Sequence, residues 1–212
     1  MKRILIVDDH TIVRNGIMRL LQDLLEEPID FHEAGNGQQA LDSISSGDFN
    51  LVLLDISLPG RNGLDVLRQI RQLQPTLPVL VLSMYSDNQY AVRALRAGAS
   101  GYVTKDSAAE VLKQAVETVL VGKRYVSTQQ GDLLAEAISE THDETEPHKL
   151  LSDREFQFAC LLTAGKTMTE IAQELSLSVK TVSTYRTRVL EKLRLRTNAE
   201  IINYCLTHSI TL

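Results

Sequence analysis

The chain has 212 residues, of which 43% are hydrophobic and 23% charged, and its net charge is -5. This composition is typical of globular proteins, and at roughly 100 to 200 residues per domain the length allows one large domain or two small ones. The N-terminal apolar run, residues 4–7, is too short for a signal peptide or a membrane span, so we expect a cytoplasmic protein without membrane contact.

The first 121 residues alternate short apolar runs with amphipathic stretches. The expected strands are 2–7, 31–34, 49–54, 78–83 and 101–104. The expected helices are 11–25, 37–45, 63–73, 88–97 and 108–121. The last helix is expected to start in a capping box formed by Ser107 and Glu110. Five such alternations predict an α/β doubly wound, five-stranded parallel sheet.

Polar side chains stand at the ends of four of these strands. Asp8 and Asp9 follow the first strand, Asp55 follows the third, Ser83 ends the fourth and Lys105 follows the fifth. In doubly wound sheets, ligands bind beyond the carboxyl ends of the strands, close to the point where strand order reverses. We therefore expect these five side chains to meet at one edge of the sheet.

Their chemistry suits phosphoryl transfer. Three neighbouring carboxylates repel one another unless a cation joins them, and oxygen ligands are those that Mg²⁺ prefers. Such an ion would neutralise phosphoryl oxygens while one carboxylate attacks phosphorus. Asp55 is the expected nucleophile, Lys105 offers a positive charge to one phosphoryl oxygen, and Ser83 donates a hydrogen bond to another.

A linker is expected between residues 122 and 149, with room for one more helix at 127–138. Residues 139–149 contain no apolar side chain. As a flexible coil of about 11 residues this stretch spans roughly 20 Å. The predicted domains are therefore 1–121 and 150–212.

The second domain shows no strand signal, and four short helices fit it. Capping boxes mark three starts, at Ser152 with Glu155, Thr167 with Glu170, and Thr197 with Glu200, and Ser178 is the expected N-cap of the fourth helix, 179–193. A three-residue break at 176–178 joins this helix to 168–175, which is the outline of a helix-turn-helix. Cys160 and Cys205 lie in helix-like apolar segments, which favours buried thiols over a disulfide or a zinc site.

The charge is distributed unevenly between the two parts of the chain. Residues 1–149 carry 14 basic and 21 acidic residues, whereas residues 150–212 carry 8 and 6. Six of those 8 basic residues lie between positions 178 and 197, with Glu191 as the one acid. A short basic segment on an acidic protein indicates contact with a polyanion.

One face of the helix at 179–193 is apolar, and the opposite face is basic and rich in hydroxyl groups. We expect Ser183, Thr184 and Thr187 to contact base edges in the major groove of duplex DNA, and Lys180, Arg188 and Arg194 to contact phosphates. Arg186 falls on the apolar face and is expected to reach water or pair with a carboxylate, such as that of Glu155.

Several segments together identify a family resemblance. Residues 1–121 resemble the receiver domain of two-component response regulators, in Val7-Asp8-Asp9-His10 and in the segments 54–63, 82–85 and 98–105. Residues 150–212 look like the LuxR-type DNA-binding domain of the NarL/FixJ subfamily. This resemblance implies a flavodoxin-like receiver domain followed by an all-α, four-helix helix-turn-helix domain.

The resemblance also implies a phosphorylation switch. It assigns Asp55 as the acceptor of a phosphoryl group from a sensor histidine kinase, Asp8, Asp9, Asp55 and the Ser57 backbone carbonyl as Mg²⁺ ligands, and Ser83 and Lys105 as phosphoryl contacts. Tyr102 takes the place of the aromatic side chain that turns inward in the switch, although a half-buried tyrosine on an edge strand would look the same. The implied partners are a second copy of the chain, duplex DNA and RNA polymerase.

Two other classes of protein remain open at this point. A phosphatase of the dehalogenase-like type would also use an aspartate nucleophile, but Ser57 stands where its general acid would be. A regulator switched by a small molecule would need an apolar pocket in the first domain, and the acidic edge disfavours one. We therefore expect a regulator of transcription that accepts a phosphoryl group, and no enzyme.

Overall fold

A computed structural model describes residues 1–84, 88–127, 130–131, 147–208 and 210. The chain divides into two compact units, Met1–Leu133 and Leu134–Leu212. Most of the helix predicted at 127–138 and of the linker stretch at 139–149 lies outside the described residues. Pro147–Leu150 forms a short 3-10 helix, η1.

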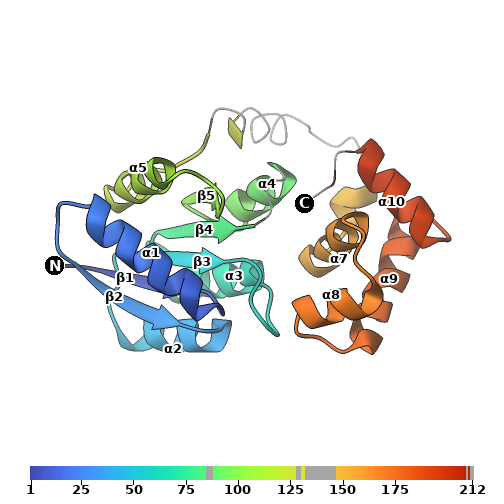
Figure 1. The fold of residues 1–212 in the computed structure, drawn as a ribbon, viewed down its shortest axis with the longest axis horizontal. Helices are drawn as coiled ribbons and strands as arrows, with labels where there is room; N and C mark the ends of the chain where they lie inside the picture. Colours follow the sequence, from blue (N-terminus) through green and yellow to red (C-terminus); the bar gives the residue numbers. More distant parts are fainter. Residues whose placement is uncertain (85–87, 128–129, 132–146, 209, 211–212) are drawn as a thin grey trace. The chain divides into compact units, whose positions relative to one another are not determined.

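The first unit is built on a five-stranded parallel sheet (Figure 1). Its strands are β1 Lys2–Val7, β2 Ile29–Ala34, β3 Leu51–Asp55, β4 Val79–Ser83 and β5 Gly101–Thr104, in the order β2-β1-β3-β4-β5. All residues of β3 and β4 are buried, because helices cover both faces of a doubly wound sheet. The predicted fold class is confirmed. Strands β1 and β5 have the predicted bounds, and those of the other three strands differ from the prediction by one or two residues.

Five described helices alternate with these strands: α1 Thr11–Leu24, α2 Gly37–Ser46, α3 Gly63–Leu73, α4 Asn88–Arg96 and α5 Ala109–Leu120. Figure 1 shows α1 and α5 on one face of the sheet and α2 and α3 on the other. On the first face, Leu21 of α1 and Val116 of α5 pack against Ile4, Leu53 and other buried strand residues. This packing fixes the strand ends in space.

The capping box predicted at Ser107 is wrong. Helix α5 begins one residue later than expected, with Ala108 at its N-cap and no side-chain cap. The Ser107 hydroxyl instead lies 2.8 Å from the Thr104 hydroxyl at the end of β5. The backbone after β5 turns at this point, which places Ser107 outside the helix.

The second unit is helical in its described part, with α7 Asp153–Thr163, α8 Met168–Glu174, α9 Val179–Leu193 and α10 Asn198–Thr207. The capping boxes at Ser152 and Thr167 are both present, and the Ser178 hydroxyl caps α9, as predicted. At Thr197 the box is incomplete, because the Glu200 carboxylate accepts the N–H of Arg196 and not that of the N-cap. Cys160 and Cys205 are both buried thiols, as expected.

The turn between α8 and α9 is short. Ser176 adopts a left-handed conformation at φ 52°, and the Leu177 N–H donates to the Ala172 carbonyl, which ends α8. Val182 and Val189 of α9 are buried and face the preceding helices. Helix α9 therefore keeps its other face in solvent.

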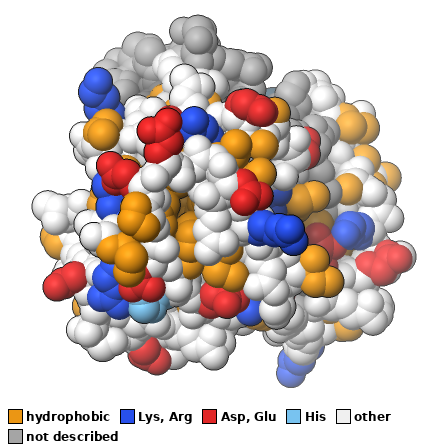
Figure 2. All heavy atoms as spheres, turned by 60° about the vertical axis from the view of Figure 1, so that its left-hand side comes forward, with side chains coloured by type: hydrophobic (Ala, Val, Ile, Leu, Met, Phe, Trp, Pro, Cys, Tyr) orange, Lys and Arg blue, Asp and Glu red, His pale blue; other side chains and the backbone are white. Residues whose placement is uncertain are grey.

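The outer surface carries both signs of charge. On the face in Figure 2, acidic and basic side chains lie interspersed among hydrophobic and other groups. Across the part of the chain that the structure describes, no helix combines the length and the apolar character needed to cross a membrane.

Candidate phosphoryl-acceptor site and nucleic-acid interface

Strand register brings the first two carboxylates together. Strands β1 and β3 are neighbours, and Val7 pairs with Leu54, so the residues that follow, Asp8 and Asp55, stand at the same level. Strand β2 lies on the other side of β1. The two carboxylates therefore occupy the position where strand order reverses, at the carboxyl edge of the sheet.

Lys105 joins these carboxylates. Its Nζ lies 2.6 Å from Asp8 Oδ2 and 2.8 Å from Asp55 Oδ2. Both carboxylates are almost fully buried, with exposed fractions of 1% and 2% for the two residues. The Lys105 N–H donates to the Ser83 carbonyl at 2.7 Å, because β4 and β5 are paired up to this point. Pairing of β5 with β4 therefore places the Lys105 ammonium group at the acidic edge of the sheet.

The second oxygen of each buried carboxylate accepts a backbone hydrogen bond. The Ser57 N–H donates to Asp55 Oδ1 at 3.0 Å, and the His10 N–H donates to Asp8 Oδ1 at 2.8 Å. Ser83 is completely buried at the end of β4. The loops after β1 and β3 therefore hold both carboxylates in fixed orientations.

Tyr102 is 2% exposed, so the alternative of a half-buried tyrosine on β5 is wrong. Met84, the residue that follows β4, is 66% exposed. The Met84 side chain therefore lies largely in solvent.

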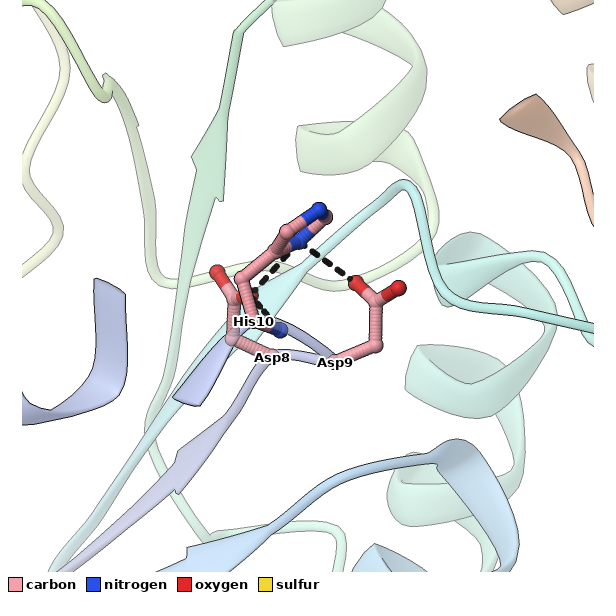
Figure 3. Close-up of side chains that lie close together, drawn as sticks. All are labelled: Asp8, Asp9 and His10. Carbon is pink, nitrogen blue, oxygen red and sulfur yellow. Dashed lines mark hydrogen bonds and ion pairs between the residues drawn. The ribbon is translucent and has the colours of Figure 1, made fainter. Parts of the chain in front are cut away.

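Asp9 and His10 complete the edge (Figure 3). The His10 imidazole lies 3.0 Å from Asp9 Oδ1 and 3.4 Å from Asp8 Oδ1, and its side chain is 68% exposed. Ligand atoms of Asp8, Asp9 and His10 all lie within 4.8 Å of one another. Sequence reasoning alone gives His10 no role, although its position next to two carboxylates is a usable signal.

Arg14 is a second contact that sequence reasoning missed. This residue of α1 donates to the Asp8 backbone carbonyl at 2.7 Å. A single arginine on a helix carries no sequence signal for such a contact. The contact forms because the loop between β1 and α1 brings the Asp8 carbonyl to the Arg14 side chain.

Burial and charge set the protonation of this site. Burial raises the pKa of Asp55 above its ordinary value, while Lys105 and the Ser57 N–H oppose the increase and Asp8 adds to it. Burial lowers the pKa of Lys105, but attraction to Asp55 and Asp8 outweighs this, so that its pKa is raised and it stays charged. Asp8 and Asp55 share the Lys105 ammonium group, and Asp9 adds a third carboxylate next to Asp8, so the carboxylates outnumber the ammonium groups at this edge. The donor set therefore fits a divalent cation with oxygen ligands.

The candidate interface for nucleic acid lies on α9. The side chains assigned to DNA contacts are all exposed, namely Lys180, Ser183, Thr184, Thr187, Arg188 and Arg194. The first five lie on the helix itself. Arg194 is its C-cap, in a left-handed conformation at φ 57°, so its side chain leaves the helix in a direction that a helical wheel does not give.

Two other basic residues near this face are engaged in structural contacts. Arg186 donates to the Asn198 side chain at the start of α10. Lys192 lies 2.6 Å from the buried carboxylate of Glu155 and donates to the Leu150 carbonyl at 3.0 Å. The proposed pairing of Arg186 with Glu155 is therefore wrong, because Lys192, six residues further along α9, occupies that carboxylate.

Comparison with known proteins extends over almost the whole chain. Residues 4–117 match the response regulator receiver domain, and residues 149–205 match the bacterial regulatory proteins of the luxR family. Response regulator GacA of Pseudomonas viridiflava is 33% identical over 210 residues, which cover 99% of this chain and 98% of the relative. The chain belongs to the response regulators. Its receiver domain and its LuxR-type second domain together make it a regulator of transcription that responds to phosphorylation.

Two further relatives support this membership. Response regulator UvrY of Escherichia coli K12 is 31% identical over 99% of this chain and 96% of the relative. A solved structure of RcsB from Salmonella enterica serovar Typhimurium, bound to promoter rprA with the phosphomimetic BeF3-, has a TM-score of 0.62 and 26% identity. That structure covers 96% of this response regulator and 98% of the RcsB chain.

Proposed function

We propose that Asp55 accepts a phosphoryl group from the phosphohistidine of a sensor kinase. The observation that carries this proposal is the shared ammonium group, because Lys105 contacts Asp55 and Asp8 in a buried site. An Asp55 carboxylate oxygen attacks phosphorus while the phosphorus–nitrogen bond of phosphohistidine breaks. The electron pair of that bond stays on the leaving nitrogen, and because the other ring nitrogen already carries a proton, the histidine leaves as neutral imidazole. The transfer gives an aspartyl phosphate and a free histidine.

Neighbouring residues have distinct tasks in this proposal. Asp8, Asp9, Asp55 and the Ser57 carbonyl would hold Mg²⁺, which neutralises charge on the phosphoryl oxygens when bound. Lys105 transfers its contact from the Asp55 carboxylate to a phosphoryl oxygen, and the Ser83 hydroxyl donates to another. Tyr102 is the aromatic side chain of the switch, and it is already buried in this structure.

For the second domain, we propose that α9 enters the major groove of duplex DNA. Its support is the exposed basic and hydroxyl-bearing face, opposite the buried Val182 and Val189. Ser183, Thr184 and Thr187 contact base edges, while Lys180, Arg188 and Arg194 contact phosphates. The solved complex of RcsB with promoter rprA and the phosphomimetic BeF3- supports a DNA-binding role for the second domain.

The same proposal covers partners and catalysis. Each chain accepts one phosphoryl group and turns over no substrate, so we infer that the protein is a stoichiometric switch and no enzyme. We also propose that it acts in the cytoplasm. Phosphorylation or DNA binding joins two copies of the chain, and RNA polymerase is the partner that reads the result at a promoter.

Phosphorylation by a small donor tests the acceptor assignment. Acetyl phosphate with Mg²⁺ should add one phosphate to the full chain, detected by intact-mass spectrometry, and Asp55→Asn should abolish the addition. Asp42→Asn is the matched control, because Asp42 is an exposed carboxylate on α2. Equal labelling of the Asp55→Asn variant contradicts the proposal. Labelled wild type should then bind promoter DNA more tightly than unlabelled protein.

A further inference from the structure

Arg14 has an unusual set of contacts behind the acidic edge. Its Nε lies 2.6 Å from the Glu33 carboxylate on β2, one terminal nitrogen donates to the Asp8 carbonyl at 2.7 Å, and the other donates to the Thr11 hydroxyl at 3.1 Å. Its side chain is only 12% exposed. One planar guanidinium thus connects the end of β2, the first turn of α1 and the loop between β1 and α1.

The Asp8 carbonyl belongs to the peptide unit that leads into Asp9. Because that unit is planar, fixing its oxygen also fixes the direction in which the Asp9 backbone starts. The carboxylate of Asp8 has independent support from Lys105 and from the His10 N–H. The Asp9 carboxylate contacts the exposed His10 imidazole and, within the described part of the chain, no other hydrogen-bonding group. The orientation of Asp9 therefore depends on its backbone.

We propose that Arg14 is a positioning residue for the divalent cation, and this rests on the function proposed above. Arg14 holds the Asp8–Asp9 peptide so that the Asp9 carboxylate stays close to Asp8, where their ligand atoms lie within 4.8 Å of one another. Glu33 has a second task, since an unneutralised guanidinium this close to the site would repel a divalent cation. Arg14 and Glu33 together orient the Asp8–Asp9 peptide without adding net positive charge near the cation site.

Two substitutions separate positioning from a purely structural link between β2 and α1. Arg14→Lys keeps the charge but loses the planar fork that reaches three partners at once. Glu33→Gln keeps a hydrogen-bond acceptor for Arg14 and removes the neutralising charge. Arg68→Lys is the matched control, because Arg68 pairs with Asp65 on the exposed surface of α3.

The test is Mn²⁺ binding to the unphosphorylated full chain, measured by calorimetry at low and high salt. Arg14→Lys should weaken binding about tenfold, the size expected when a residue that orients metal ligands is lost. Glu33→Gln should weaken it less, and high salt should reduce that loss because the effect is electrostatic. Arg68→Lys should bind as the wild type does.

Phosphorylation provides a second readout. With Arg14→Lys, the Mg²⁺ concentration that gives half of the maximal acetyl phosphate labelling should rise about tenfold, while labelling at saturating Mg²⁺ returns to the wild-type level. Wild-type Mn²⁺ affinity in a folded Arg14→Lys variant overturns the positioning role, whatever its thermal midpoint. If that variant does not fold, Arg14→Gln takes its place in the same Mn²⁺ measurement, and wild-type affinity there overturns the positioning role. Wild-type affinity of Glu33→Gln at low salt overturns the neutralising task of Glu33. Failure of the wild type to bind Mn²⁺ instead contradicts the proposed function itself.

Discussion

Asp8 and Asp55 are almost completely buried around Lys105, whereas Lys180 and Arg188 on α9 extend into solvent. The acidic site keeps its charges in place with close partners, which costs desolvation but fixes geometry for a reaction at one atom. The basic face of α9 leaves its charges hydrated, ready to replace counterions along a nucleic-acid backbone. The two regions thus suit a small covalent ligand and a long polyanion respectively.

The largest expected effect comes from breaking the buried ion pair. Lys105→Ala leaves two buried carboxylates without a counter-charge and should lower the free energy of unfolding of the first unit by about 3 to 5 kcal/mol. Urea unfolding without divalent ions measures this. Mg²⁺, or a second substitution Asp55→Asn, should recover part of the loss. Lys113→Ala, which removes an exposed pair with Glu117, should change stability little.

The second unit also contains a buried carboxylate that is paired with a lysine, that of Glu155 with Lys192. Hydrogen bonds from Lys192 and Ser152 lower the pKa of Glu155 in spite of burial, which by itself raises it. A carboxyl group with a lowered folded-state pKa stabilises the protein above its ordinary pKa of 4.5, and this stability is lost as pH falls through the lowered value.

Glu155→Gln should therefore cost about 1 to 3 kcal/mol at neutral pH. The difference in urea unfolding free energy between wild type and variant should shrink as the pH is lowered below 4.5. A difference that stays constant between neutral pH and pH 3 would show that the ionised carboxylate contributes nothing.

The smallest effects are expected on the exposed face of α9. Lys180→Ala and Arg188→Ala should each weaken DNA binding several-fold and lower the slope of log affinity against log salt by about one. Arg186→Ala should leave that slope unchanged, since Arg186 is bound to Asn198. Fluorescence anisotropy with duplex DNA at several salt concentrations measures the slopes. Equal slopes for wild type and Lys180→Ala would remove Lys180 from the phosphate contacts.

Local patterns predicted most of the elements of this response regulator. The continuous apolar runs 51–54 and 79–82 could be recognised as covered strands, and the hydroxyl residues at 152, 167 and 178 do cap helices. The error at Ser107 has the same local origin. Its sequence satisfies the capping pattern, but the chain leaves β5 through a turn that delays the helix.

The alternation of runs, the residues at the strand ends and the separation of acidic from basic segments were determined by the sequence itself. Only the tertiary structure decided which charges meet: Lys105 with Asp8, 97 residues away, Lys192 with Glu155, 37 residues away, and Arg14 with Glu33. Periodicity and capping report contacts within a few residues. Long-range pairs depend on strand register and helix packing, which the whole buried core sets together.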